Sequence, residues 1–252
     1  MNQVEKAKRF GELHIKGNPL VLYNAWDAGS AKAIRAGGAK AVATSSWAVA
    51  AAQGYRDGED APLDMVLGIY ERIVAAIDAP VTVDFEGGYS EDDTELAANI
   101  GRLLGLGAIG INFEDRVVRG QGLYNADRQA ARIKAIRQAS DSRGIDLYIN
   151  ARTDLFLGSK GDPKDSVGEA IERGKTYAAA GASGLFIPGL VDDALIRQIC
   201  DGVPLPVHVM VSTGVSQMAD LAALGVARVS YGNIPYTDAM AALQQAATAI
   251  YV

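Results

Sequence analysis

The chain has 252 residues, 49% of them hydrophobic, so it is long enough to bury a large core as one domain over residues 1–252. Its 24 basic and 30 acidic residues give a net charge of −6 without long runs of one sign, which argues against nucleic-acid binding. With a single cysteine, no signal-peptide core and no run of about 18 apolar residues, we expect a cytoplasmic protein without internal disulfides or membrane contacts.

Short apolar or β-branched runs recur along the chain, each separated from the next by a segment with helical spacing of apolar residues. The eight runs are residues 20–23, 41–44, 81–84, 110–113, 147–150, 184–187, 207–209 and 228–231. Strands this apolar, alternating with helices, predict a parallel sheet covered by helices. Eight of them favour a closed (β/α)8 barrel, the TIM barrel, within the α/β class.

Four glycines repeat at one kind of position, between a predicted helix and the next predicted strand. They are Gly38, Gly107, Gly181 and Gly225. The end of a helix often needs a residue in the left-handed region, which glycine adopts without steric cost. The four glycines therefore predict a repeated helix-to-strand connection.

Polar residues follow five of the runs, at the end where a barrel of this type carries its functional loops. They are Asn24 and Asp27, Ser45 and Ser46, Asp84 and Glu86, Glu114 and Asp115, and Asn150, Arg152 and Asp154. Each residue alone has a structural explanation, because Asp, Asn and Ser commonly cap the following helix. The set as a whole predicts a functional site at this end of the barrel.

Asp84 and Glu86 stand two positions apart at the end of the third run, so in extended backbone they point to the same side. Two carboxylates held together repel each other unless a cation lies between them. Glu114 ends the neighbouring run and adds a third oxygen ligand. Because no histidine stands beside them, this oxygen-only set predicts Mg2+, or Mn2+ as a substitute, rather than Zn2+.

Arg152 follows the fifth run directly, and its planar guanidinium is suited to hold a carboxylate or phosphonate through two hydrogen bonds. The structural alternative is an ion pair with Asp154 or with a metal-site carboxylate. Asp57 stands in a turn-rich loop after the second run, where it either joins the outer shell of the metal or shapes the turn. His208 lies within an apolar run and is expected to be packed inside the barrel.

With these residues in place, the chain resembles the isocitrate lyase / phosphoenolpyruvate mutase superfamily over nearly its whole length. The resemblance rests on the order and spacing of residues 23–27, 44–47, 54–57, 83–89, 112–115 and 150–154. It implies a barrel whose last helix is exchanged with a partner subunit, commonly in a dimer-based tetramer. We therefore expect a homo-oligomer, either a dimer or a tetramer.

The resemblance also implies the roles of the site residues, with Mg2+ held largely through waters and a 2-oxo acid held by the strand-two loop and an arginine. The implied metal site is Asp84, Glu86 and Glu114. The implied substrate-binding residues are Tyr23, Trp26, Ser45, Ser46, Trp47, Asp84 and Arg152. The implied catalytic residues are Asp57, Glu114 and Arg152.

Two departures from the family pattern bear on the reaction. Lyases of the family that cleave isocitrate or methylisocitrate carry a Lys-(Lys or Arg)-Cys-Gly-His segment after the fourth strand, with the cysteine as proton donor. Here residues 116–126 contain no cysteine, although their glycines suit a mobile lid, in which Tyr124 and Asn125 are candidates for substrate contact. Pro188 ends the sixth run where phosphoryl-transferring members tend to place a histidine, which weakens the mutase hypothesis.

The leading hypothesis is Mg2+-dependent cleavage at C3 of a small 2-oxo or 2-hydroxy dicarboxylate, with oxaloacetate decarboxylation as its simplest form. The metal would act as a Lewis acid on the 2-oxo oxygen, and preorganised donors would stabilise the enolate. P–C bond cleavage of phosphonopyruvate is the chemical alternative. The alternative outside the enzymes is a protein that binds a 2-oxo acid without catalysing a reaction.

Overall fold

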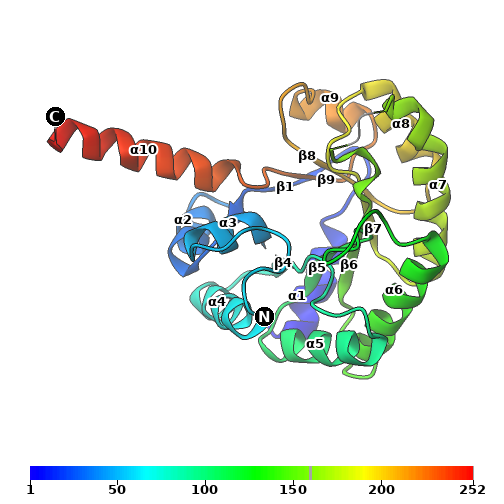
Figure 1. Cartoon of the computed structure of the whole chain (residues 1–252), viewed down its shortest axis with the longest axis horizontal. Coiled ribbons are helices and arrows are strands. Elements are labelled where there is room, and N and C mark those ends of the chain that lie inside the picture. The colour runs from blue at the N-terminus through cyan, green and yellow to red at the C-terminus, as the bar shows by residue number, and fades with distance from the viewer. Residues whose placement is uncertain (159–160, 252) are drawn as a thin grey trace.

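The strands form one parallel sheet that closes into a barrel (Figure 1). The computed structural model describes residues 1–158 and 161–251, and within them the sheet has the order β1-β9-β8-β7-β6-β5-β4-β3-β2. The strands are β1 (Leu20–Leu22), β2 (Asn24–Ala25), β3 (Val42–Thr44), β4 (Val81–Asp84), β5 (Gly110–Glu114), β6 (Tyr148–Arg152), β7 (Gly184–Phe186), β8 (Val207–Met210) and β9 (Arg228–Ser230).

The first and last strands in this order are two parts of one run, separated only by Tyr23. β1 pairs with β9, whereas β2 pairs with β3, so the run bridges the two ends of the sheet. When β1 and β2 are counted as one strand, the barrel has eight strands, and every adjacent pair is parallel. The predicted (β/α)8 barrel is confirmed.

Helices alternate with the strands, and α4 to α8 wrap around one side of the sheet in Figure 1. Their bounds are α1 (Gln3–Glu12), α2 (Ala28–Ala36), α3 (Ser46–Ala52), α4 (Leu63–Ala76), α5 (Asp93–Gly105), α6 (Ala126–Asp141), α7 (Pro163–Ala179), α8 (Asp193–Gly202), α9 (Met218–Ala223) and α10 (Ile234–Tyr251), with a 3-10 turn at Asp154–Phe156. No helix in the described ranges combines the length and the hydropathy needed to cross a membrane.

The connections follow the local chemistry of the chain. Several helices begin at an Asp or Asn whose side chain accepts a hydrogen bond from a first-turn N–H, as Asp92 does for α5 and Asp192 for α8. The four repeated glycines before strands all have positive φ, between 92° and 100°. Their predicted left-handed role at helix-to-strand connections is confirmed.

On β4, β5 and β6 the outer face of the strands is apolar and the inner face is mostly polar. Val83, Ile111 and Ile149 alternate with the inner residues and are fully or almost fully buried against the helices. The register aligns Asp84 with Asn112, and Asn112 with Asn150, across three adjacent strands. Hydrophobic packing against the helices therefore fixes the strands, and a row of polar side chains lies on their inner face, inside the barrel.

The last helix, α10, leaves the barrel and extends into the space beside it (Figure 1). Only Pro235 of this helix is buried, and the apolar side chains Leu243 and Ile250 are 62% and 77% exposed. The outer face of β1 is uncovered as well, since Val21 is 40% exposed. Exchange of this helix between subunits remains a prediction.

Candidate active site

A pocket of about 160 Å³ opens at the carboxyl ends of the strands, where the polar residues were predicted to gather. It is lined by Asn24, Ser45, Ser46, Trp47, Asp57, Asp84, Asn112, Arg152, Leu157, Phe186, Pro188, Met210, Ser230, Gly232 and Asn233. Six of the predicted site residues are therefore brought together here. They come from four separate loops or strand ends, as expected of a barrel site.

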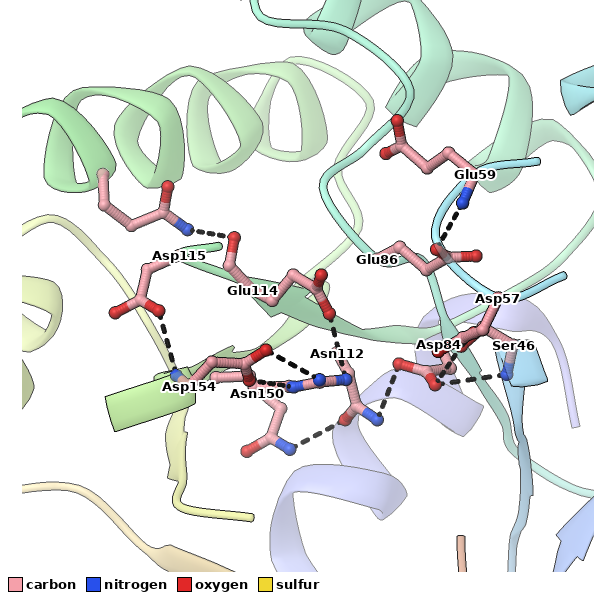
Figure 2. A network of polar contacts seen from close by, with 12 residues as sticks. Ser46, Asp57, Glu59, Asp84, Glu86, Asn112, Glu114, Asp115, Asn150 and Asp154 are labelled. Atoms are coloured by element: carbon pink, nitrogen blue, oxygen red, sulfur yellow. Dashed lines mark hydrogen bonds and ion pairs between the residues drawn. The ribbon is translucent and has the colours of Figure 1, made fainter. Parts of the chain in front are cut away.

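Ser46 links two of the pocket carboxylates (Figure 2). Its backbone N–H donates to Asp84 Oδ2 at 3.2 Å, and its hydroxyl lies 2.8 Å from the same oxygen and 3.0 Å from Asp57 Oδ1. A hydroxyl has one hydrogen, so it can donate to only one carboxylate at a time. The pair is therefore best satisfied when Asp57 holds a proton and donates it to Ser46 Oγ while Ser46 donates to Asp84.

The pKa of Asp57 is raised, first by burial of its carboxyl group and then by the neighbouring charge of Asp84. Ser45, in contrast, has a helix-capping role, because its hydroxyl accepts from the Ala48 N–H at 3.3 Å. The loop after β3 thus supplies both the start of α3 and the group that joins two acidic residues.

Glu86 does not have the extended backbone that the sequence predicted for it. The strand ends at Asp84, and Glu86 adopts the left-handed region with a φ of 50°, inside a turn where the Gly88 N–H donates to the Phe85 carbonyl oxygen at 2.9 Å. Its Oε2 accepts from the Glu59 N–H at 2.6 Å. The expectation of two side chains pointing the same way from extended backbone was wrong at this residue, because the backbone is no longer extended there.

The Glu86 turn concentrates backbone strain. Glu59 and Tyr89 also have positive φ, at 58° and 62°, and the Tyr89 N–H donates to Glu59 Oε1 at 2.7 Å. Non-glycine residues in this region cost on the order of 1–3 kcal/mol each and persist only where their surroundings hold them. Three such residues, joined by two hydrogen bonds, lie together at this corner of the site.

Arg152 is fixed by Glu114 and Asp154, two acidic residues that lie across the site from Ser46 and Asp57 in Figure 2. Its Nη1 lies 3.0 Å from Glu114 Oε2, while Nε and Nη2 donate to the two oxygens of Asp154 at 2.6 and 3.0 Å. Asp154 is fixed in turn, because its N–H donates to Asp115 Oδ1 at 3.0 Å. The structural ion pairs considered for Arg152 are thus present, and Arg152 still reaches the pocket wall.

The site contains more acidic than basic side chains. The pKa of Glu86 is raised to about 9 by burial and then by the carboxylates of Asp57 and Asp84. Burial likewise raises the pKa of Glu114 to about 8, against the opposing effect of Arg152. Buried carboxylates that resist ionisation together are typical of a place where a cation belongs.

The donor set fits Mg2+ better than Zn2+, since every candidate ligand in the site is an oxygen. In the described residues, no three His, Cys, Asp or Glu side chains are arranged to hold a metal directly. Asp84 and Asp57 line the pocket, whereas Glu86 and Glu114, which contact Glu59 and Arg152, do not. Mg2+ commonly binds through one or two carboxylates and several waters, and this arrangement suits that mode.

Four predicted contact residues lie elsewhere. Tyr23 is 41% exposed, packs against Tyr231 and borders a groove on the outside of the barrel. Trp26 packs edge-on against Tyr236, with ring centroids 5.3 Å apart. In the lid segment, Tyr124 lies over the Arg132 guanidinium, and Asn125 caps α6 by accepting from the Arg128 N–H at 2.8 Å. None of these four lines the pocket in the described part of the chain.

Sequence reasoning missed several pocket residues, above all Asn112. It lies two positions before Glu114 on β5, so the alternation of a strand directs both to the same face. Ser230 and Asn233, at and after the end of β9, were also missed. Both residues stand at a strand end, where functional residues of a barrel are expected. The sequence contains no further signal, because their run has no acidic residue.

Several known proteins are similar to this chain in sequence and in fold. A family model described as phosphoenolpyruvate phosphomutase matches residues 10–251. A crystal structure from Burkholderia cenocepacia J2315, with the provisional name phosphonomutase, has a TM-score of 0.94 and 46% identity, over 97% of this chain and 99% of that chain. An uncharacterized protein of Mycobacterium tuberculosis is 35% identical over 242 residues, which are 96% of this chain and 88% of the relative.

Relatives with named activities are more distant. The 2-methylisocitrate lyase of Escherichia coli is 29% identical over 206 residues, covering 79% of this chain and 68% of the lyase. A phosphoenolpyruvate phosphomutase of Streptomyces hygroscopicus and an oxaloacetate decarboxylase of Pseudomonas savastanoi also match. The relatives thus include lyases, a decarboxylase and a phosphomutase.

Proposed function

Since the chain belongs to the phosphoenolpyruvate phosphomutase family, within the isocitrate lyase / phosphoenolpyruvate mutase superfamily, we propose that it cleaves the bond at C3 of a small 2-oxo or 2-hydroxy dicarboxylic acid. Decarboxylation of oxaloacetate is the simplest form of this reaction. The observation that carries the proposal is the pocket in which Arg152 and the Asp57–Ser46–Asp84 group face one small volume.

We also propose Mg2+, or Mn2+, as the cofactor of this pocket, held by Asp84 and through waters by Asp57, Glu86 and Glu114. When bound, the cation would supply Lewis acidity toward the 2-oxo oxygen and a carboxylate of the substrate. The oxygen-only donor set and the excess of acidic side chains support this assignment. A phosphonopyruvate hydrolase that shares the fold, at 21% identity, was solved with oxalate and Mg2+, which makes oxalate a suitable probe.

Arg152 would bind the substrate carboxylate. A guanidinium has five N–H groups, and the contacts with Glu114 and Asp154 use three of them. N–H groups remain on both Nη1 and Nη2, and a carboxylate of the substrate can accept from them. Because Glu114 and Asp154 already fix the side chain, substrate binding costs little further ordering of this residue.

Asp57 and Ser46 would handle the proton. In oxaloacetate the C3–C4 bond breaks, CO2 leaves, and the electron pair of that bond forms the enolate of pyruvate. The enolate carbon C3 then takes one proton, which Asp57 can supply from the hydrogen-bonded series that runs through Ser46 to Asp84. Water returns the proton to Asp57 after product release.

The side chains absent from the pocket favour decarboxylation over the longer lyase reactions. Cleavage of a 2-hydroxy acid needs a base for the hydroxyl and a separate acid for the new carbanion. No histidine or cysteine lines the pocket among the residues that the structure describes. Decarboxylation needs only an electron sink and one proton donor, and the pocket has residues for both.

P–C bond cleavage of phosphonopyruvate is the second candidate, because the relative at 46% identity carries a phosphonomutase name. Pro188 occupies the pocket wall at the end of β7, so this wall offers no side chain to accept a phosphoryl group. Transfer would therefore go to water, which makes a hydrolase the more suitable form of this alternative.

Product assays separate the candidates. The protein is incubated with oxaloacetate or with phosphonopyruvate in the presence of Mg2+, and pyruvate and phosphate are measured. We expect pyruvate from oxaloacetate well above the rate of free Mg2+, and loss of that excess in Asp84→Ala. Phosphate release would favour the second candidate, and inertness toward both substrates would reject both.

A protein that binds 2-oxo acids without turnover gives a different result in calorimetry. It would bind oxalate with Mg2+ yet convert no member of a panel of 2-oxo acids. We expect Asp84→Ala to abolish Mg2+-dependent oxalate binding under either function. Unchanged oxalate affinity in that variant would refute the metal-site assignment.

For assembly, we propose a cytoplasmic homo-oligomer, a dimer or tetramer, in which α10 of one copy covers another. The uncovered β1 face borders a groove of about 630 Å³ whose apolar lining includes Leu13, Leu20, Val21 and Ile34. The exposed apolar side chains of α10 give this groove a matching occupant. Light scattering is expected to show an oligomer for the full chain and a monomer after removal of residues 238–252; an unchanged mass would contradict the exchange.

A further inference from the structure

The barrel interior below the pocket is a continuous hydrogen-bonded network. Asn112 Nδ2 donates to Asp84 Oδ1 at 3.3 Å, and Asn150 Nδ2 donates to Asn112 Oδ1 at 2.8 Å. The same Asn150 nitrogen lies 2.8 Å from His208 Nδ1, and His208 Nε2 lies 2.7 Å from Ser230 Oγ. Polar side chains therefore connect the acidic pocket with the interior of the opposite barrel wall.

Arg228 enters this network from below. It is 1% exposed and its Nη2 donates to Asn112 Oδ1 at 3.1 Å. Its Nε and Nη1 have no hydrogen-bond partner in the described residues, and no carboxylate there forms an ion pair with it. A buried cation without a paired anion lowers stability by several kcal/mol. Arg228 therefore lowers the stability of the folded protein.

Two donors fix the orientation of the Asn112 amide. Asn150 and Arg228 both donate to one atom of that amide, so the atom must be the carbonyl oxygen, whose two lone pairs are then used. A flipped amide would face two N–H donors with its own NH2 group. The NH2 group of Asn112 is thus directed to Asp84 and to the pocket that Asn112 lines.

One N–H of the Asn112 amide is available for a ligand. Its nitrogen carries two hydrogens, and Asp84 is the one acceptor that the described residues offer it. A charged donor on the oxygen of an amide polarises the amide and strengthens its N–H groups as donors. Arg228 supplies this charge from a position where it cannot touch the pocket contents, since the pocket lining does not include it.

We propose that Asn112 is a substrate-contacting residue whose Nδ2–H donates to an oxygen of the bound 2-oxo acid, and that Arg228 is the positioning residue that fixes and polarises this amide. The proposal rests on the proposed function for the nature of the ligand. It adds an uncharged donor to the acidic side of a pocket whose other anion-binding group, Arg152, lies on the neighbouring strand β6.

Four variants test the two roles, with oxalate and Mg2+ as the probe in calorimetry. Arg228→Met keeps the bulk of the side chain but removes the charge, and we expect oxalate affinity to fall about tenfold while Tm rises by a few degrees. Arg228→Lys should restore most of the affinity. Asn112→Asp keeps an acceptor for Arg228 but turns an oxygen toward the pocket, and we expect a loss of about a hundredfold.

Tyr148→Phe is the matched control. Tyr148 is buried in the same barrel, and its hydroxyl has no hydrogen-bond partner in the described residues. Its removal should leave oxalate affinity unchanged. Affinity loss of equal size in Tyr148→Phe and Arg228→Met, or unchanged affinity in Arg228→Met, would overturn the proposal. A lower Tm in Arg228→Met would do so as well, because Arg228 would then be structural.

A separate readout distinguishes failure of this proposal from failure of the proposed function. If the wild-type protein binds no oxalate, the proposed function fails, and the side-chain amide protons of Asn112 still report its orientation by NMR. Slow exchange of these protons in the wild type and fast exchange in Arg228→Met would support positioning by Arg228. Equal exchange in both proteins would refute it.

Discussion

His14, the first of the two histidines of the chain, makes folding stability depend on pH. Its ring stacks on Tyr148, with centroids 3.9 Å apart, and lies edge-on to Phe10. Its Nδ1 is 2.8 Å from the Phe10 carbonyl oxygen, so Nδ1 carries the hydrogen and Nε2 is unprotonated. Burial, and after it the charge of Arg228, lower the pKa of His14 from 6.5 to about 3.

The sign and size of the effect follow from proton linkage. The unfolded chain binds the proton near pH 6.5 and the folded protein only near pH 3, so stability from neutral His14 is present above pH 6.5 and is lost as the pH falls toward 3. Between pH 7 and pH 5 the loss is about 2 kcal/mol, because at pH 5 the unfolded state is protonated and the folded state is not.

Urea unfolding of the wild type and of His14→Gln at pH 7, 6 and 5 measures this effect. Glutamine does not titrate, and its amide can still donate to the Phe10 carbonyl. The comparison is needed because the buried carboxyls of Glu86 and Glu114, whose pKa values are raised, favour the folded state as the pH falls. The wild-type advantage over His14→Gln should shrink by about 2 kcal/mol from pH 7 to pH 5. An advantage that stays constant would refute the reasoning.

Two further predictions concern the support of the site. Asp115 is fully buried and accepts from Arg173 Nη1 at 3.1 Å, so Asp115→Asn should lower the free energy of unfolding by about 3 kcal/mol in urea titrations, because it leaves a buried cation with a weaker partner. An effect below 1 kcal/mol would contradict this assignment. Gly88→Ala forces a Cβ into the Leu96 side chain at a φ of 82°, whereas Gly54→Ala, at a φ of 81°, meets open space. We expect a loss of about 1 kcal/mol for Gly54→Ala and of at least about twice that for Gly88→Ala; equal losses would show that backbone strain alone decides.

Much of the barrel follows from the spacing of residues along the chain. Local patterns of two or about four residues determine the eight strands and the left-handed glycines. They also determine that Asp84, Ser46 and Arg152 lie at strand ends. In each case a short stretch of sequence contains the whole cause. The pattern therefore predicts the structure without knowledge of distant contacts.

The remaining features depend on partners far away in the sequence. Glu86 turns because the strand ends before it and because the Glu59 N–H, 27 residues upstream, holds its carboxylate. Arg228 and Asn112 meet across 116 residues inside the closed barrel. From the sequence, Asn125 fits a lid residue and a helix cap equally well. In the fold it caps α6 by accepting from the Arg128 N–H.

The start of α10 connects the outside of the protein with the pocket. Gly232 and Asn233 line the pocket, and Tyr236 packs against Trp47, another lining residue, with ring centroids 6.0 Å apart. From there the helix runs about 27 Å away from the barrel, given its 18 residues. One continuous segment thus forms part of the pocket wall at its start and lies beside the barrel over the rest of its length. A substitution at the start of α10 is therefore also a change to the pocket wall.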